Sequence, residues 1–269
     1  MTAPQQLVPT IGEQVNLAAY DTRYKGDWDK VSARAEFSRL QSMKKELQQV
    51  LYADGSKSLL IVLQAMDAGG KDGTIKNVFE GINPQGVRVA SFKQPTSEEL
   101  SHDFLWRIHQ HTPPNGYIGI FNRSHYEDVL VVRVENIVDE HVWQARYDHI
   151  NNFEKLLADS GTRILKFFLH ISREEQKERF QDRLDRPDKN WKFSKGDLGV
   201  REKWGQYMTA YEDVLTRCTT EYAPWHIVPA DRKWYRNLVI SQKIVETLQS
   251  MDLRYPQPED NLDSVVIPD

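Results

Sequence analysis

The stretch that decides the fold is Leu59-Leu60-Ile61-Val62-Leu63-Gln64-Ala65-Met66-Asp67-Ala68-Gly69-Gly70-Lys71-Asp72-Gly73-Thr74-Ile75. Its five consecutive apolar residues, several of them branched, predict a strand that is buried on both faces. A turn with three glycines and one lysine follows, and apolar residues then recur at helical spacing from Ile75 to Ile82. A strand, a glycine-rich turn and a helix in this order are typical of a loop that binds phosphate groups.

The glycine-rich turn has the chemistry of such a loop. Small residues let backbone N–H groups approach phosphate oxygens, the helix N-terminus adds partial positive charge, and Lys71 would reach the outer phosphates. The turn departs from the common P-loop pattern, because Ala65 replaces its first glycine and Asp72 replaces the Ser or Thr that holds magnesium. The carboxylate of Asp67 beside the phosphates predicts that they are bound with a metal ion. The alternative is an ordinary glycine turn between a strand and a helix.

Composition limits the class of protein. The chain has 269 residues, of which 39% are hydrophobic and 28% are charged, as expected for a globular protein with one large α/β domain or two small ones. The net charge of −4 argues against general nucleic-acid binding. One cysteine, Cys218, excludes an internal disulfide and favours a reducing cytosol. No apolar run approaches the ~18 residues of a membrane span and no signal pattern opens the chain, so we expect a cytoplasmic protein without a membrane anchor.

Strands alternate with helices along the rest of the chain. Runs of branched and aromatic residues predict strands, and apolar residues spaced by three and four predict helices. The predicted strands span residues 59–63, 87–92, 117–121, 162–171 and 225–229, and the two longest predicted helices span 32–53 and 139–160. Five strands that alternate with helices indicate one parallel sheet with helices on both faces.

Capping residues predict where further helices begin. Thr96 and Glu99 form a capping box, which predicts one helix that carries apolar residues as far as Ile108. Asp197 and Asp231 are the expected N-caps of the helices that follow them.

A second polar cluster, Asn122-Arg123-Ser124-His125-Tyr126-Glu127-Asp128, directly follows the third predicted strand. In nucleotide-binding folds a strand of this kind delivers an acid that binds the metal, and Arg123 could hold a phosphate with two parallel hydrogen bonds. Lys93, Lys233 and Arg236 are expected near the same carboxyl edge of the sheet, where ligands bind in open α/β sheets. The alternative for the cluster is a solvated loop with a local Arg–Asp pair.

Residues 173–203 hold ten lysines and arginines, interrupted by one proline and two glycines. A hinged basic segment after the fourth strand predicts a lid that closes over phosphates and excludes water. A surface helix with the i,i+4 pairs Glu175–Arg179 and Asp182–Arg186 is the alternative. A lysine, arginines, acids for a metal and a basic lid together indicate phosphoryl transfer, which depends on positioning and positive charge.

Several separated stretches resemble polyphosphate kinase family 2, in the same order and over about residues 57–250. They are Asp67 to Thr74, Phe92-Lys93-Gln94-Pro95-Thr96, His102 to Arg107, Phe121 to Val129, Ala223-Pro224-Trp225 and Pro229 to Trp234. The resemblance implies a P-loop kinase-like, three-layer α/β/α fold with a five-stranded parallel sheet and a helical lid, similar to thymidylate kinase. It implies a single domain, with an N-terminal arm and helix over 1–56, a core over 57–251, a lid over about 183–203 and a tail over 252–269.

The resemblance also implies an activity. Family members transfer the terminal phosphate of inorganic polyphosphate reversibly to a nucleotide, with Mg²⁺, or Mn²⁺, as the cofactor. Asn122 with Glu127 resembles the class III form, whose members convert AMP to ADP and ADP to ATP. Family analogy further implies a homodimer or homotetramer.

Matching positions imply roles for individual residues. Catalytic roles fall to Lys71, Arg123 and Asp67. Phosphate binding falls to Ala68, Gly69, Gly70, Lys71, Asp72, Gly73, Thr74 and Lys93, and the acceptor nucleotide to Asn122, Arg123 and Glu127. The lid residues for polyphosphate are Arg179, Arg183 and Lys192. The first candidate for the metal ligand is Asp67, and the second is Asp128. Two other functions stay open: an ATP-dependent kinase for a nucleotide or small metabolite on the same fold, and a phosphate- or nucleotide-binding protein without catalysis.

Overall fold

The computed structural model describes residues 7–258, 265 and 267, and its centre is one parallel sheet. The five strands lie in the order β2-β3-β1-β4-β5, and every paired neighbour is parallel. They are β1 (Ser58–Gln64), β2 (Val87–Ser91), β3 (Ile118–Asn122), β4 (Thr162–His170) and β5 (Trp225–Pro229). β1 is buried along its whole length, because it lies between two strands and under helices on both faces.

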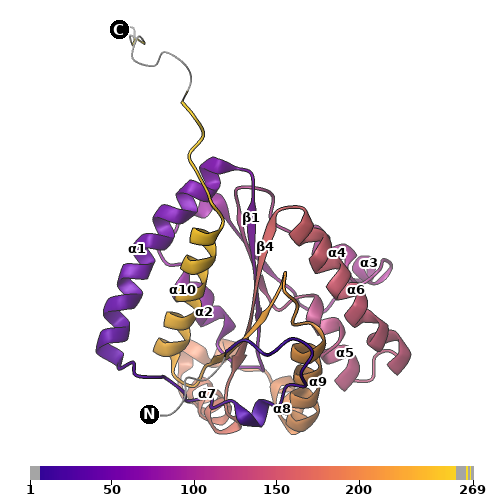
Figure 1. Cartoon of the computed structure of the whole chain (residues 1–269). Helices are drawn as coiled ribbons and strands as arrows, with labels where there is room; N and C mark the ends of the chain where they lie inside the picture. The colour runs from indigo at the N-terminus through magenta and orange to yellow at the C-terminus, as the bar shows by residue number, and fades with distance from the viewer. Residues whose placement is uncertain (1–6, 259–264, 266, 268–269) are drawn as a thin grey trace.

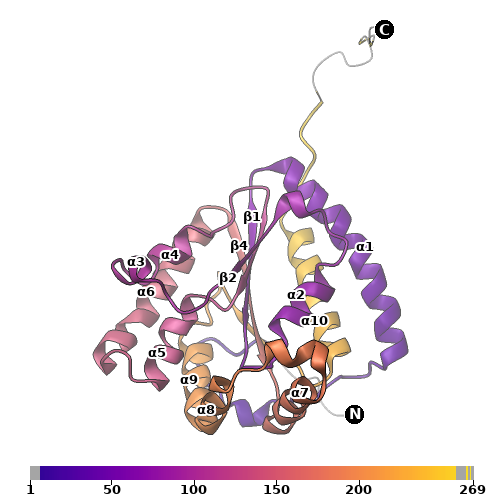
Figure 2. The ribbon, with the colours of Figure 1, turned by 180° about the vertical axis from the view of Figure 1, so that it is seen from behind.

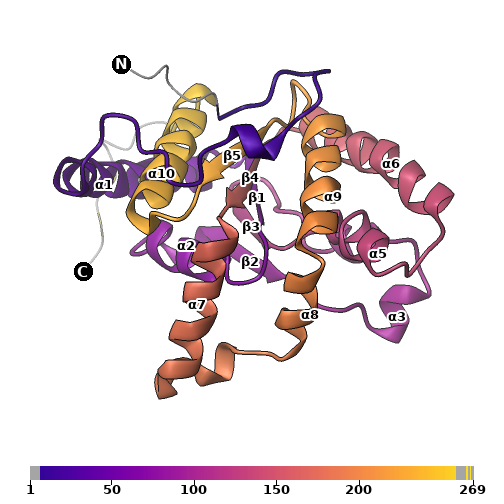
Figure 3. The ribbon, with the colours of Figure 1, turned by 90° about the horizontal axis from the view of Figure 1, so that it is seen from below.

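Helices cover both faces of the sheet (Figures 1 and 2). One layer holds α1 (Lys30–Asp54), α2 (Lys71–Val78) and α10 (Lys233–Ser250). The other layer holds α3 (Ser97–Leu100), α4 (Trp106–His109), α5 (Val131–Val134), α6 (Glu140–Asp159) and α9 (Trp204–Arg217). α7 (Arg173–Asp185) and α8 (Gly196–Glu202) lie below the carboxyl ends of the strands (Figure 3). These layers confirm the expected three-layer α/β/α fold.

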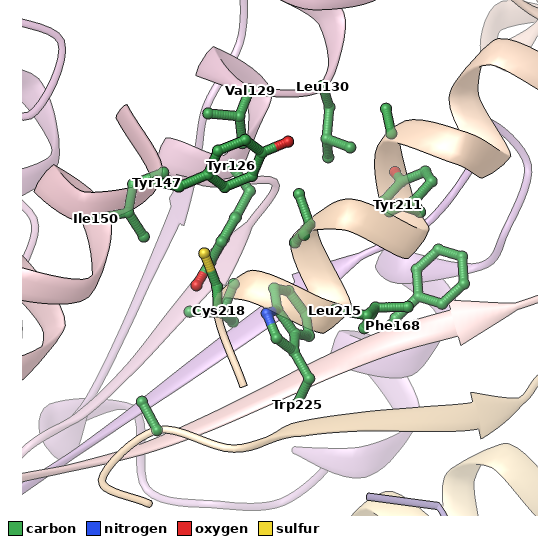
Figure 4. Close-up of a cluster of buried hydrophobic side chains, with 14 of the residues drawn as sticks. Tyr126, Val129, Leu130, Tyr147, Ile150, Phe168, Tyr211, Leu215, Cys218 and Trp225 are labelled. Atoms are coloured by element: carbon green, nitrogen blue, oxygen red, sulfur yellow. The ribbon is translucent and has the colours of Figure 1, made fainter. Parts of the chain in front are cut away.

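Each face of the sheet has its own hydrophobic core. Towards α1 and α10, side chains of β1 such as Leu59 and Ile61 pack against Leu238 and Ile244. Towards α6 and α9, the core is more aromatic, and Figure 4 shows Tyr126, Tyr211 and Trp225 among its members. Cys218 is buried in this aromatic core, and burial raises the pKa of its thiol to about 12, so this cysteine is held as an inert apolar side chain.

The register of the sheet sets the position of the functional loops. Asn122, the last residue of β3, pairs with Leu63 of β1, and the N–H of Arg123 donates to the Leu63 carbonyl at 3.1 Å. The turn after β3 therefore begins beside the turn after β1. This places the two polar clusters of the sequence at one edge of the sheet.

Four local expectations are wrong. The capping box of Thr96 and Glu99 forms, but it begins a helix of only one turn, and α4 is a separate turn. Asp197 lies inside the first turn of α8, and the N-cap of that helix is Lys195. The N-cap of α10 is Arg232, because the Asp231 carboxylate accepts instead from the Thr22 hydroxyl and the Ser172 N–H.

The fourth concerns an ion pair on α7. Glu175 and Arg179 form the expected pair at 2.8 Å. Asp182, however, pairs with Lys189 at 2.5 Å, and Arg186 pairs with Asp188 at 2.9 Å. The chain leaves the helix at Arg186 with an extended backbone, so the i,i+4 geometry ends before this residue.

The segment before α1, from Leu7 onwards, lies over the domain (Figure 3). The Leu7 carbonyl accepts from the Ile227 N–H of β5 at 2.7 Å, and the Thr22 carbonyl accepts from the Asp231 N–H at 3.2 Å. At the other end, α10 stops at Ser250, and half of the predicted tail, like residues 1–6, lies outside the described residues.

Candidate active site

A cavity of about 1150 Å³ opens at the carboxyl edge of the sheet. Its walls come from the loop between β1 and α2, the ends of β2 and β3, α7, the segment up to Asp197, and the start of α10. The expected phosphate and lid residues that line it are Asp67, Ala68, Gly69, Gly70, Lys71, Asp72, Gly73, Lys93, Asn122, Arg123, Arg179, Arg183 and Lys192. Six segments that are far apart in the sequence thus converge on one site, and each of them contributes at least one cation.

The glycine loop has a backbone that few residues other than glycine can adopt. Gly70 has φ 102° and is the N-cap of α2 without a side-chain cap, so the first N–H groups of this helix are left for a ligand. A Cβ on Gly69 would stand 2.7 Å from the Met66 carbonyl oxygen, which the packing does not allow. Thr74 lines no wall of the cavity, because it is buried and its hydroxyl donates to the Gly70 carbonyl at 3.0 Å.

Two side chains of α7 hold the loop from below. Arg179 donates from Nη1 to the carbonyls of Ala68 and Gly69, both at 3.0 Å, and from Nη2 to the Ala230 carbonyl at 2.6 Å. Gln176 donates to the Asp67 carbonyl at 2.9 Å and accepts from Arg201 of α8. Arg179 therefore lies under the loop and not in the lid segment for which the sequence suggested it.

Lys71 begins α2 and points back into the loop. Its Nζ donates to the Ala65 carbonyl at 3.0 Å. Burial lowers the pKa of Lys71, the charge of Arg123 lowers it further, and the carboxylates of Asp67 and Glu127 oppose both effects. An ammonium surrounded in this way gains from a phosphate group, which replaces lost hydration with a direct partner.

Arg123 joins the two polar clusters. Its Nη2 donates to Asp67 at 2.9 Å and its Nη1 donates to Glu127 at 3.2 Å. Chiefly the negative charge of Glu127 raises the pKa of Arg123, so the guanidinium stays charged. Its φ of 63° is rare for a residue with a Cβ, and the backbone hydrogen bond to Leu63 helps to fix this conformation.

A second cavity of about 320 Å³ lies behind Arg123. It shares Asp67, Arg123 and Asp197 with the larger cavity, whereas Glu127 lines only the smaller one. The rest of its wall is mostly apolar or aromatic and includes Met66, Leu130, Val131, Val200, Tyr207 and Tyr211. The site therefore has a large cationic chamber and a small, partly apolar one that meet at an Arg–Asp pair.

Asn122 and Asp128 differ in their relation to the site. Asn122 donates to the Asp72 carboxylate at 2.7 Å, which links the end of β3 to α2 inside the larger cavity. Asp128 lines neither cavity and pairs with Arg146 at 3.0 Å. Burial raises the pKa of Asp128 to about 6. The structure does not bring this carboxylate to the other predicted metal ligand, Asp67.

The expected lid segment contains a 3₁₀ turn over Pro187–Lys192 and then α8. Arg183 donates to the Lys192 carbonyl at 3.0 Å and to Asp197 at 3.3 Å, so it ties the two ends of this segment together. Lys192 and Lys189 line the larger cavity.

A buried ionic network under the site escaped the sequence analysis. Lys166 of β4 is fully buried and pairs with Glu154 of α6 at 2.5 Å and with the Tyr126 hydroxyl at 2.7 Å. Glu154 also accepts a hydrogen bond from Tyr126 and lies 3.1 Å from His125, so the network fixes the turn that follows Arg123. The signal in the sequence was Lys166, a lysine inside an apolar strand. A buried lysine is costly unless it has a partner of opposite charge, so its position indicates a buried ion pair.

The sequence model of the family described as Polyphosphate kinase 2 matches residues 27–256. A Meiothermus ruber protein named AMP/ADP-polyphosphate phosphotransferase is 59% identical over 222 residues, which are 82% of this chain and 83% of that protein. A Rhodopseudomonas palustris protein named ADP-polyphosphate phosphotransferase is 46% identical over 260 residues, or 91% of this chain and 90% of that protein.

A solved structure agrees with these relatives. The crystal structure of polyphosphate kinase 2 from Arthrobacter aurescens TC1 superposes with a TM-score of 0.92 at 41% identity and covers 96% of this chain and 92% of that one. Within the described part of the chain, no helix has the length and apolar character needed to cross a membrane. The match of family, sequence and fold extends over almost the whole length, and the chain therefore belongs to the polyphosphate kinase 2 family.

Proposed function

We propose that this protein transfers the terminal phosphate of inorganic polyphosphate reversibly to AMP and to ADP. The single observation that carries the proposal is the pair of cavities that share Arg123 and Asp67. The large cationic cavity suits a condensed phosphate chain, and the small one, with its apolar and aromatic wall, suits a nucleotide. The names of the Meiothermus ruber and Rhodopseudomonas palustris relatives support the two acceptors.

The residues that line the two cavities supply the positioning and charge that phosphoryl transfer needs. Lys71 holds the phosphate that is transferred, and the N–H groups at the start of α2 bind the donor chain beside it. Arg123 faces both cavities, so its guanidinium neutralises charge that spreads over the phosphate between donor and acceptor. Glu127 holds Arg123 in place on the acceptor side, and Asn122 holds Asp72 in place within the larger cavity.

The carboxylates that line the larger cavity also fit a magnesium ion. No group of three or more His, Cys, Asp or Glu side chains with metal-binding geometry occurs in the part of the chain that the structure describes. Mg²⁺ in phosphoryl-transfer sites commonly takes only one or two carboxylates and completes its shell with phosphate oxygens and water. Asp67 and Asp72 both line the larger cavity and would provide them. The ion, once bound, would neutralise charge on the phosphates; Mn²⁺ is expected to substitute.

Exchange of Asp67 and of Asp128 for Asn separates the two candidate metal ligands. We expect D67N to lower kcat by about 10²-fold or more, because it removes a charge at the junction of the two cavities. We expect D128N to retain kcat within about threefold, because Asp128 lies outside both cavities. Steady-state rates over a series of Mg²⁺ concentrations measure both. A larger loss in D128N than in D67N would contradict the assignment of Asp67.

Phosphorus NMR of the purified protein tests the function itself. With Mg²⁺ and polyphosphate, we expect AMP to give first ADP and then ATP, and ADP in a separate tube to give ATP. Product from ADP alone would remove AMP as an acceptor. Turnover with ATP as donor and a metabolite as acceptor, without polyphosphate, would instead support the conventional kinase. Binding of both ligands without turnover would support a protein that only binds.

We also propose a cytoplasmic location and a homo-oligomer, both on family analogy. Sedimentation of the purified protein would measure its oligomeric state, and a monomer would contradict the second proposal.

A further inference from the structure

Arg236, in the first turn of α10, is a buried cation without a counter-ion. Only 2% of its surface is exposed. Its Nε and Nη2 donate to the Asn237 side-chain oxygen at 3.1 and 2.8 Å, and Nη1 has no hydrogen-bond acceptor among residues 7–258. No carboxylate in this range forms an ion pair with it. Burying a guanidinium in this way is costly, so the fold retains a charge that it does not use for its own stability.

The free nitrogen lies against the glycine loop. Nη1 occupies the space where a Cβ on Gly70 would stand, and Nη2 is 3.8 Å from the Cβ position of Gly73. Gly70 is the N-cap of α2 and carries no side-chain cap. The uncapped N–H groups of the helix and the free Nη1 of Arg236 therefore lie side by side and face the same cavity.

Positive charge is concentrated around this part of the loop. Arg179 Nη1 is 3.4 Å from the same Cβ position of Gly70, and its carboxylate partner, Glu175, is on the far side at Nε. Burial and the neighbouring Arg179 charge lower the pKa of Arg236 to about 9. Lys233, one turn earlier on α10, also lines the cavity. An anion between these groups would relieve their repulsion.

The position of Arg236 selects the kind of anion. Arg236 lines the larger cavity only, whereas Arg123 lines both. A phosphate of the acceptor nucleotide would come from the smaller cavity, so the group at Arg236 belongs to the donor side. Resting on the function proposed above, we propose that Arg236 and the N-terminus of α2 bind a phosphate of the polyphosphate donor that is not itself transferred.

Two variants and one control test this site. Arg236→Met removes the charge at similar length, and Arg236→Lys keeps the charge but loses the planar fork. Lys243→Met removes a charge from the same helix, where Lys243 pairs with Glu246 at 2.9 Å, outside both cavities. Calorimetric titration with tripolyphosphate and, separately, with ADP distinguishes donor from acceptor binding, and thermal melting without ligand reports on the fold.

We expect R236M to bind tripolyphosphate about 10- to 100-fold more weakly and ADP within about twofold of the unchanged protein. Without ligand its melting temperature should equal or exceed that of the unchanged protein, because an unpaired buried charge is gone. R236K should lose several-fold in tripolyphosphate affinity, and K243M should lose nothing. In turnover, R236M should raise KM for polyphosphate more than it lowers kcat, since the phosphate at Arg236 is not transferred.

Three results would overturn the proposal: unchanged tripolyphosphate affinity in R236M, an equal loss for ADP, or a clearly lower melting temperature without ligand. If R236M does not fold, unchanged tripolyphosphate affinity in R236K would overturn it as well. These binding results are independent of transfer. A protein that binds tripolyphosphate through Arg236 but phosphorylates neither AMP nor ADP would refute the proposed function and leave this site standing.

Discussion

Lys71→Met should lower kcat about 10³-fold, which corresponds to about 4 kcal/mol of transition-state stabilisation. Lys71 projects from the start of α2 into the loop, and its Nζ donates to the Ala65 carbonyl. Burial and Arg123 both lower its pKa, so the ammonium is poorly solvated and interacts strongly with a phosphate that arrives. Methionine keeps the length of the side chain and removes only the charge and its donors. Initial rates with saturating polyphosphate and ADP measure the effect.

Lys76→Met provides the matched control. Lys76 lies on the same helix, is exposed and lines neither cavity, so its loss should leave kcat unchanged. An equal loss in both variants would show that positive charge on α2, and not its position in the loop, sets the rate.

Arg123→Lys should lower kcat by about 10²- to 10³-fold although the charge is kept. Arg123 donates to Asp67 and to Glu127 from two different nitrogens of one planar group, and lysine has only a single nitrogen without this rigid fork. The backbone at this position has φ 63°, which is equally unfavourable for Lys and Arg. The comparison therefore reports on the side chain and not on backbone strain. Single-turnover rates with ADP would separate the chemical step from binding.

Arg133→Lys is the control for a lost guanidinium elsewhere. Arg133 pairs with Asp213 at 2.5 Å on the α9 side of the domain and lines neither of the two cavities at the site. We expect its kcat to stay within about twofold. A rate for R123K that is as high as that of R133K would contradict the role of Arg123 at the junction.

The sequence was sufficient where a local pattern determines the structure. The apolar run before Ala65 can only be a buried strand, and the glycines after Asp67 can only be a tight turn, so the loop and its helix are predictable. The second cluster was predictable for the same reason, because it follows another strand of a parallel sheet. The second cluster lies next to the glycine loop because β3 lies beside β1. No local sequence pattern determines this strand order.

Failures occurred where one local signal competed with another. The capping box at Thr96 is real, but the Asp103 side chain accepts from the Leu105 N–H at 2.9 Å and starts a new turn, so one predicted helix becomes two. The family resemblance placed Arg179 among the lid residues. Its actual partners are carbonyl oxygens of Ala68 and Gly69, which are more than a hundred residues away, and no spacing rule reaches that far.

Burial is the other property that the sequence conceals. Arg236 was expected near the carboxyl edge, and it is there, but nothing in its neighbours along the chain indicates that it is almost completely covered and unpaired. Basic residues on α7 and on the lid segment look alike in composition, yet Arg179 is buried and Lys192 is exposed. Their different surroundings, and not their type, decide which of them hold the loop and which face the cavity.

The segment before α1 has a consequence for self-association. β5 is the last strand of the sheet, so its outer backbone groups would be free to recruit a strand from another molecule. The hydrogen bond from the Ile227 N–H to the Leu7 carbonyl occupies part of this outer edge of β5. The segment before α1 therefore protects the edge strand β5 against aggregation. Removing this segment would leave backbone N–H and C=O groups of β5 unpaired, and the glycine loop between β1 and α2 would keep its chemistry.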